Sequence, residues 1–136
     1  MAVVDASVWA ARFLRKDRAH ERAKAWFARA VDERLVIHVP AVALAELAGA
    51  IARQTEQKRG NRLAGEAVAV LQASGAKVVE VSHALASRAA QIAAKHRVRG
   101  CDAIYVALAE QLSEPLVSLD AEQLSRGGAV VETIEP

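Results

Sequence analysis

The sequence predicts an α/β fold in a single domain spanning residues 1–136, with a mostly parallel five-stranded sheet flanked by helices. Three observations lead to this prediction. A chain of 136 residues can bury one core but is too short to expect two. Its 53% hydrophobic content is rich in alanine, which favours closely packed helices. Short β-branched runs alternate with longer segments of helical periodicity, as in parallel sheets.

Each expected strand is a short apolar segment: "AVVDAS" at 2–7, where the strand ends at Asp5, "LVIHVP" at 35–40, "KVVEVS" at 77–82, "PLVSLD" at 115–120 and "AVVETI" at 129–134. Helices are expected in the segments between them: 8–34, 41–59, from 61 to about 75, 83–97, the segment after Gly100, and 121–126.

Local signals set the expected helix ends. Pro40 suits the first turn of the helix that follows it, and Gly60 is expected to break the helical text after residue 59. Gly75 is expected to stop the next helix, and Ser82 to cap the one after it. Trp9, Phe13, Trp26 and Phe27 recur at helical spacing, which favours packing in a core or a partner groove over base stacking.

Composition narrows the functional classes. No apolar run approaches the roughly 18 residues of a membrane span, and residues 1–11 lack the basic start of a signal peptide. The single Cys101 allows no internal disulfide and is expected to be a small buried thiol in a reducing, cytoplasmic setting. A net charge of +2 permits a nucleic-acid partner without requiring one. Neither a phosphate-binding loop nor a dinucleotide fingerprint is present.

The most informative pattern is a set of carboxylates in largely uncharged surroundings: Asp5, Glu46, Asp102 and Asp120. The first is the only charge in residues 1–11, and the second is the only charge from 39 to 52. The third stands alone between Arg99 and Glu110, whereas the fourth has Glu122 nearby. Burying an unpaired carboxylate costs several kcal/mol, so each needs an explanation. Taken singly, each has a structural one: a helix cap, a braced turn, or an ion pair with a distant arginine.

Taken together, their positions point to one site. Ligands of open α/β sheets bind at the carboxyl ends of the strands, where all four acids are expected. Like charges raise each other's pKa, and a divalent cation relieves that conflict. Oxygen ligands favour Mg²⁺ or Mn²⁺, and no Cys/His cluster argues for another metal. The surplus of acids suits a site that also holds water and a phosphate, with one or two ions.

The same residues carry a resemblance to a known family. "VVDAS", "PAVALAELAGA", "RGCDAIYVALA" and "LVSLDAEQL" resemble, in order and spacing, the motifs of the PIN-domain ribonucleases, and within them the VapC-type toxins of type II toxin–antitoxin pairs. The resemblance covers residues 2 to about 134. It implies a PIN-like domain and metal-dependent RNA cleavage, with Asp5, Glu46, Asp102 and Asp120 as the catalytic, metal-binding acids.

The resemblance also implies a mechanism and partners. A bound Mg²⁺ or Mn²⁺ would polarise the scissile phosphate and activate a water, with Asp5 or Asp102 as the proton acceptor. Ser7 and Ser118 match positions that would support the carboxylates or the water. The expected partners are an RNA substrate and a cognate antitoxin, with the chain as a homodimer or in a toxin–antitoxin hetero-oligomer.

The basic residues have two interpretations. Arg99, three residues before Asp102, and Arg12 and Arg15 in an early basic cluster are candidates for holding the RNA backbone. The alternative is a solvated helix face or a contact with the antitoxin.

Two rival functions are kept. One is a PIN-fold module that binds RNA or protein without cutting. The other is a receiver-type phosphoryl-transfer domain, which would need a lysine and a hydroxyl residue after successive strands. No such lysine follows "KVVEVS" or "PLVSLD", so this rival ranks last.

Overall fold

The computed structural model describes residues 1–136 and contains one five-stranded sheet in the order β3-β2-β1-β4-β5. Every strand pairs in parallel with its neighbours. The strands are short: β1 Ala2–Val4, β2 Ile37–Pro40, β3 Lys77–Val79, β4 Leu116–Val117 and β5 Thr133–Ile134. The predicted α/β fold is confirmed, and the sheet is wholly rather than mostly parallel.

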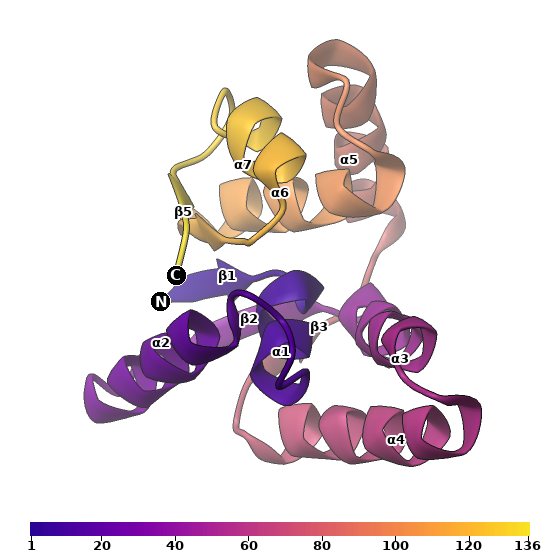
Figure 1. Cartoon of the computed structure of the whole chain (residues 1–136). Helices are drawn as coiled ribbons and strands as arrows, with labels where there is room; N and C mark the ends of the chain where they lie inside the picture. The colour runs from indigo at the N-terminus through magenta and orange to yellow at the C-terminus, as the bar shows by residue number, and fades with distance from the viewer.

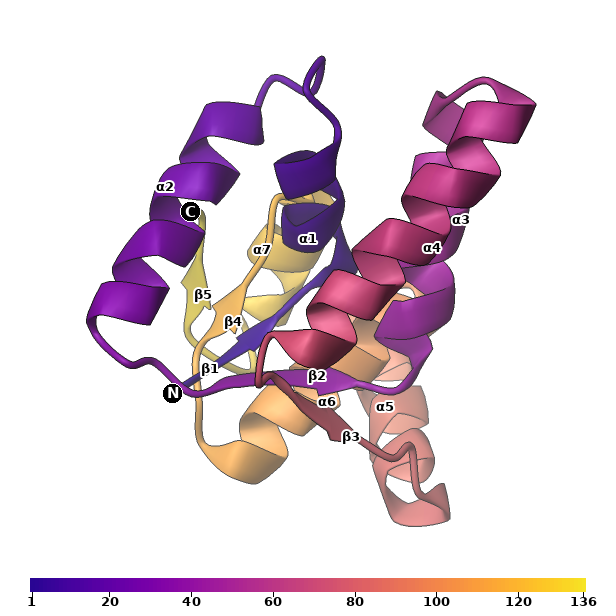
Figure 2. The same ribbon diagram turned by 90° about the horizontal axis from the view of Figure 1, so that it is seen from below.

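Helices cover both faces of this sheet. Their bounds are α1 Ala6–Phe13, α2 His20–Asp32, α3 Val42–Gln54, α4 Gln57–Ala73, α5 His83–His96, α6 Gly100–Leu112 and α7 Ala121–Gly127. Figure 1 shows α1 to α4 on one face and α5 to α7 on the other, and the view from below in Figure 2 agrees. Such a two-sided cover is the usual consequence of parallel strands, because each crossover places a helix on a face.

The core lies on both sides of β1, the middle strand. Val3 and Val4 are completely buried, as is Tyr105 on α6. On the opposite face Trp9 is also completely buried, and its ring packs 4.4 Å from that of Phe27, centroid to centroid. The predicted aromatic set is therefore largely core, with Phe13 partly exposed.

The expected continuous helix over residues 8–34 is wrong, because the chain forms α1 and α2 with a turn between them. α1 ends at Phe13, and the next residue, Leu14, has an extended backbone. The Asp17 carboxylate then accepts a hydrogen bond from the N–H of Ala19 at 2.8 Å. Trp9 on α1 and Phe27 on α2 face the same core. The helical spacing of apolar residues therefore continues across the turn, and for this reason the sequence did not predict the turn.

The expected break at Gly60 is also misplaced. The chain leaves α3 at Thr55, which is extended at φ −128° and ψ 154°, and Gly60 lies inside α4. A Cβ atom at Gly60 would lie 3.4 Å from Cα of Ala52, so the glycine lets α3 and α4 approach closely.

Other local signals had mixed outcomes. Gly75 follows α4 with a φ of +83°, and the Ser82 hydroxyl accepts a hydrogen bond from the N–H of Leu85, both as predicted. Pro40 ends β2 instead of entering the first turn of α3, which begins at Val42. β5 keeps only two residues of the expected 129–134, because the chain before it turns at 128–131. None of the helices combines the length and the apolar character needed to cross a membrane.

Candidate active site

Two of the predicted acids follow neighbouring strands at the same edge of the sheet. Asp5 comes directly after β1, and its Oδ2 accepts a hydrogen bond from the N–H of Ser7 at 2.8 Å, which caps α1. Asp120 follows β4, and its Oδ1 accepts from the N–H of Gln123 at 2.9 Å, which caps α7. Because β1 and β4 pair in parallel, both carboxylates lie at the carboxyl edge.

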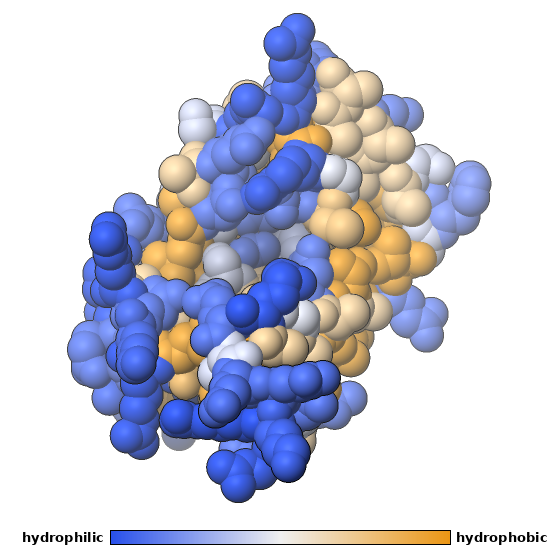
Figure 3. Space-filling view, turned by 45° about the vertical axis from the view of Figure 1, so that its right-hand side comes forward, coloured by the Kyte–Doolittle hydropathy of each residue, from blue (hydrophilic) through white to orange (hydrophobic).

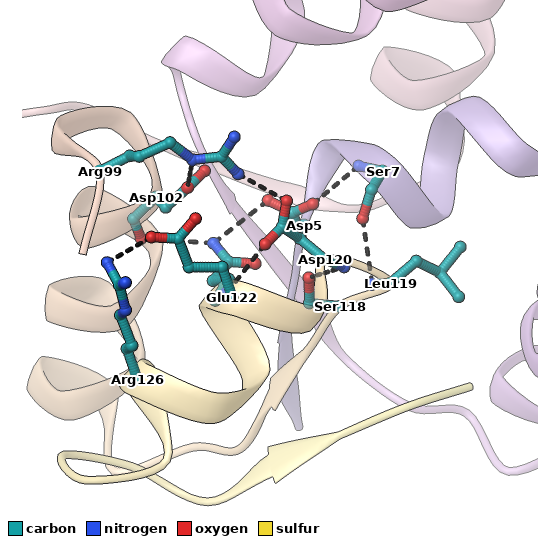
Figure 4. Close-up of polar contacts among 10 residues, drawn as sticks. Asp5, Ser7, Arg99, Asp102, Ser118, Leu119, Asp120, Glu122 and Arg126 are labelled. Atoms are coloured by element: carbon teal, nitrogen blue, oxygen red, sulfur yellow. Dashed lines mark hydrogen bonds and ion pairs between the residues drawn. The ribbon is translucent and has the colours of Figure 1, made fainter. Parts of the chain in front are cut away.

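Asp102 reaches this edge from the first turn of α6, where it is not the capping residue. The residue before that helix, Arg99, donates from Nε to Asp102 Oδ2 at 2.6 Å and from Nη2 to Asp120 Oδ2 at 2.5 Å. One guanidinium thus bridges two of the acids, as Figure 4 shows. Arg99 therefore takes a position between carboxylates that a metal cation could also take.

Glu46 lies in the middle of α3, and its Oε2 accepts a hydrogen bond from the hydroxyl of Tyr105 at 2.5 Å. Tyr105 comes from α6, one turn after Asp102, so this bond ties the two helices together beside the sheet edge. Tyr105 is absent from the residues that the sequence predicted for the site. A tyrosine within an otherwise apolar helix was the available signal.

The pKa shifts show that these acids share one electrostatic environment. Burial raises the pKa of Asp5 to about 6, hydrogen bonding by Ser7 opposes the shift, and the charges of Glu46 and Asp102 add to it. Burial also raises the pKa of Asp102, although Arg99 counteracts it. At Asp120 burial is outweighed by the backbone N–H of Gln123 and by Arg99, so its pKa is lowered. The pKa of Asp5 therefore depends on the charges of two other acids of the set, Glu46 and Asp102.

The two predicted supporting serines bind backbone after β4. The Ser7 hydroxyl accepts from the N–H of Leu119 at 3.1 Å, and the Ser118 hydroxyl accepts from the N–H of Asp120 at 3.0 Å (Figure 4). Ser118 is completely buried. Both serines thus shape the turn that carries Asp120, and Ser7 also donates its own N–H to Asp5.

One polar residue at the site was absent from the predicted set. Gln123 on α7 is completely buried, and its Nε2 lies 3.4 Å from Asp5 Oδ1 and 3.3 Å from the carbonyl oxygen of Asp102. Its Oε1 has no hydrogen-bond partner. The segment "AEQLSR" has the composition of an exposed short helix, so nothing in the sequence pointed to this residue.

The predicted RNA-contacting arginines occupy two places. Arg99 contacts the acids, whereas Arg12 lies near the far end of α1 with its guanidinium 5.0 Å from the ring centroid of Phe27. Arg12 and Arg15 line a hollow beyond α1, and neither contacts the acids. Cys101, expected to be buried, is exposed.

The donor set is suited to a hard divalent cation, because carboxylate oxygens from four separate segments reach one edge. As the side chains lie, no three acidic, histidine or cysteine groups enclose a point where a metal could bind. Arg99 holds Asp102 and Asp120, and Tyr105 holds Glu46. The residues fit Mg²⁺ or Mn²⁺ in their chemistry, and a cation that took the same oxygens of Asp102 and Asp120 would displace Arg99 from them.

The carboxyl edge is also accessible. Figure 3 shows the molecule with the right-hand side of Figure 1 turned forward, where the surface is hollowed between the two helical layers. The hollow and its rim are mainly hydrophilic. A charged substrate could therefore approach this edge.

Comparisons with known proteins agree with this architecture. The sequence profile of the PIN domain matches residues 2–128. The VapC20 toxin of Mycobacterium tuberculosis, described as cleaving the sarcin–ricin loop, has a similar structure at a TM-score of 0.82 and 23% identity, with 100% of each chain covered. A comparison with curated protein sequences finds no significant match.

Two further structures are also similar. FitAcB from Neisseria gonorrhoeae aligns at a TM-score of 0.72 and 22% identity, covering 98% of this chain and 96% of that one. VapBC2 from Rickettsia felis, bound to a DNA fragment from its promoter, aligns at a TM-score of 0.67 and 8% identity, covering 99% and 98%. At these identities the similarity establishes the fold.

Proposed function

The chain belongs to the PIN domain family, and from that premise we propose that it is a metal-dependent endoribonuclease, the toxin of a toxin–antitoxin pair. The observation that carries the proposal is the convergence of Asp5, Glu46, Asp102 and Asp120 on one accessible sheet edge. Burial raises the pKa of Asp5 and of Asp102, and neighbouring acids add to both shifts. These two carboxylates are poorly explained as structural groups, because a neutral residue could replace each without that cost.

In this proposal the same four acids hold Mg²⁺ or Mn²⁺. The bound metal supplies Lewis-acid polarisation of a phosphate and a water of lowered pKa. The residues of the chain do the rest. Asp5 or Asp102 accepts the proton of the attacking water. Arg99, once released from Asp102 and Asp120, is free to contact the RNA phosphates beside the cut.

The proposed partners follow from the similar structures. VapC20 is described as a toxin, and a further similar structure is described as a toxin–antitoxin complex from Klebsiella pneumoniae. We infer that this chain, too, is neutralised by a cognate antitoxin in the cytoplasm and that it forms a homodimer or a hetero-oligomer. The sarcin–ricin loop is the target described for VapC20. For this chain we propose RNA as the substrate class and no particular RNA.

Cleavage assays test the activity. The purified chain is incubated with total RNA and Mg²⁺ or Mn²⁺, and the expected result is discrete fragments that disappear in Asp5→Asn and Asp102→Asn. The matched control is Asp32→Asn, which makes the same change at an exposed position at the end of α2 and should cut like the wild type. Wild-type cleavage by both site variants would refute the metal-site assignment.

The same samples separate a nuclease from a binding module. A PIN-fold module that only holds RNA retains RNA binding in every variant, shows no metal-dependent turnover, and shows no Mn²⁺ among the acids in a soaked crystal.

The toxin role is tested in cells. Induced expression of the wild type should arrest growth, and co-expression of the protein encoded by the adjacent reading frame should relieve the arrest. Asp5→Asn should not arrest growth. If Asp5→Asn arrests growth as strongly as the wild type, the toxicity does not depend on the proposed chemistry.

A further inference from the structure

Gln123 is a buried amide that contacts three of the four acidic residues. Its backbone N–H donates to Asp120 Oδ1 at 2.9 Å, which places the residue at the start of α7. Its side-chain Nε2 reaches Asp5 Oδ1 at 3.4 Å and the carbonyl oxygen of Asp102 at 3.3 Å. One residue therefore connects the turn after β4, the end of β1 and the first turn of α6.

These contacts restrain the orientation of the Asp5 carboxylate. Asp5 Oδ2 accepts from the N–H of Ser7, and Oδ1 faces the amide of Gln123, so each oxygen has a donor on a different element. Rotation of the carboxylate would break one of these bonds. The Ser7 contact is local to α1, whereas the Gln123 contact links Asp5 to the segments that carry Asp102 and Asp120.

Stability accounts only in part for an amide at this position, because Nε2 has two acceptors and Oε1 has no donor. Gln123 is completely buried and its Oε1 has no partner, and an unpaired buried carbonyl oxygen costs about 1–3 kcal/mol. A leucine or methionine of similar size would fill the space beneath α7 without that cost, but it would remove the donor to Asp5 Oδ1 and to the carbonyl oxygen of Asp102. The amide therefore carries a penalty that its contacts with Asp5 and Asp102 must offset through function.

We propose that Gln123 is a positioning residue of the carboxylate site, holding the Asp5 carboxylate in the orientation set by its contacts with Ser7 and Gln123 and joining α7 to α6. The inference rests on the proposed metal-binding role of Asp5 and deepens it. Residues that orient metal ligands typically change metal affinity 10–100-fold when they are replaced. Gln123→Leu is therefore expected to weaken Mn²⁺ binding about tenfold while the melting temperature changes little, because removal of the unpaired Oε1 offsets the loss of the two weak hydrogen bonds from Nε2.

The test is a titration with Mn²⁺ alone, monitored by calorimetry or electron paramagnetic resonance without RNA, and a thermal melt of the same metal-free samples. Gln123→Met is the second apolar variant, in case branching at leucine disturbs the packing. Gln111→Leu is the matched control, because Gln111 is exposed on α6 and makes no side-chain hydrogen bond. This control should bind Mn²⁺ like the wild type.

The outcomes separate this inference from the proposed function. Mn²⁺ binding by Gln123→Leu and Gln123→Met within twofold of the wild type, while Asp5→Asn loses it, overturns the inference and leaves the function standing. A large drop in melting temperature in both variants also overturns it, because the role would then be structural. If the wild type does not bind Mn²⁺, the proposed function fails. Crystal structures of the metal-free wild type and Gln123→Leu then test the inference by themselves. An unmoved Asp5 carboxylate in Gln123→Leu overturns it, and a rotated one supports it.

Discussion

At the scale of single residues, Asp5 shows that one carboxylate can serve the fold and the site together. Its side chain caps α1 through the N–H of Ser7, yet it is almost fully buried and its pKa rises to about 6. A cap needs only a hydrogen-bond acceptor, and asparagine caps as well as aspartate. The charge of Asp5 is therefore a cost to the fold, and the proposed metal chemistry accounts for it.

This cost predicts a pH dependence. The folded pKa of Asp5 is about 6, against an ordinary aspartate value of 3.8, so its protonated form contributes stability below pH 3.8 that is lost as the pH rises through 6. The free energy of unfolding falls by about 3 kcal/mol over this range. Metal-free Asp5→Asn keeps the cap and should therefore lose less stability than the wild type between pH 4 and pH 7.5. Urea unfolding at both pH values measures the difference, and identical pH dependence in the two proteins would contradict it.

Arg99 makes a second prediction at this scale. Its guanidinium binds Asp102 and Asp120 but is 59% exposed, so each ion pair is worth about 1 kcal/mol or less. Removing the arginine frees both carboxylates, and Arg99→Ala should bind Mn²⁺ roughly fivefold more tightly. The same variant should bind RNA less tightly, because a phosphate contact is lost.

Arg62→Ala is the control for Arg99→Ala, since Arg62 is an exposed arginine on α4 that pairs only with Glu66. It removes the same charge away from the acids. Calorimetry with Mn²⁺ and filter binding with RNA provide the two readouts. Weaker Mn²⁺ binding by Arg99→Ala would show that the arginine supports the metal site instead of competing with it.

At the scale of elements, the pairing of α3 with α4 depends on a close approach at Gly60. A Cβ atom there would lie 2.9 Å from Oγ1 of Thr55 and 3.4 Å from Cα of Ala52. The Thr55 hydroxyl cannot move freely, because it donates to the carbonyl of Ile51 at the end of α3. Since α3 also carries Glu46, the packing of α3 against α4 affects where this carboxylate lies.

Gly60→Ala is therefore expected to destabilise the protein by about 1–3 kcal/mol. The paired variant is Gly65→Ala in the same helix, where nothing lies within 4 Å of the added carbon. That change should stabilise by up to about 1 kcal/mol, because alanine is the better helix former. Chemical denaturation of the two variants gives the comparison. Equal effects would show that helix propensity alone, and not the contact with α3, governs both positions.

At the scale of the whole molecule, the fold should not depend on the metal. The hydrophobic core comprises 33 buried residues on both faces of the sheet, and the acids lie at one edge of it. Treatment with EDTA should therefore abolish cleavage and leave the circular dichroism spectrum unchanged. Adding Mn²⁺ at 100 times its Kd should stabilise the protein by about 2.7 kcal/mol, because the metal binds only the folded state.

Thermal melts with and without Mn²⁺ measure this effect, and Asp5→Asn should show almost none of it. Unfolding on chelation would indicate a structural metal, contrary to the proposed role.

The sequence by itself determined the α/β alternation of the elements and the candidate acids. Alternation of β-branched runs with amphipathic segments predicted the parallel sheet, and charges isolated in apolar text marked Asp5, Glu46, Asp102 and Asp120. These features could be recognised because each of them is visible in a short stretch of neighbouring residues. The turn between α1 and α2 was not predicted, because both helices bury apolar faces in the same core and the periodicity continues across it.

Only the tertiary structure decided which side chains meet. Arg99 bridging Asp102 and Asp120, Tyr105 donating to Glu46, and Gln123 reaching Asp5 are contacts of which all but one join residues at least 21 positions apart. Their residue types are ordinary where they stand in the sequence: an arginine before a helix, a tyrosine in an apolar helix, a glutamine in a polar one. Hydrogen bonds depend on distance and angle, and these are set only when the parallel strands bring their carboxyl ends to one edge.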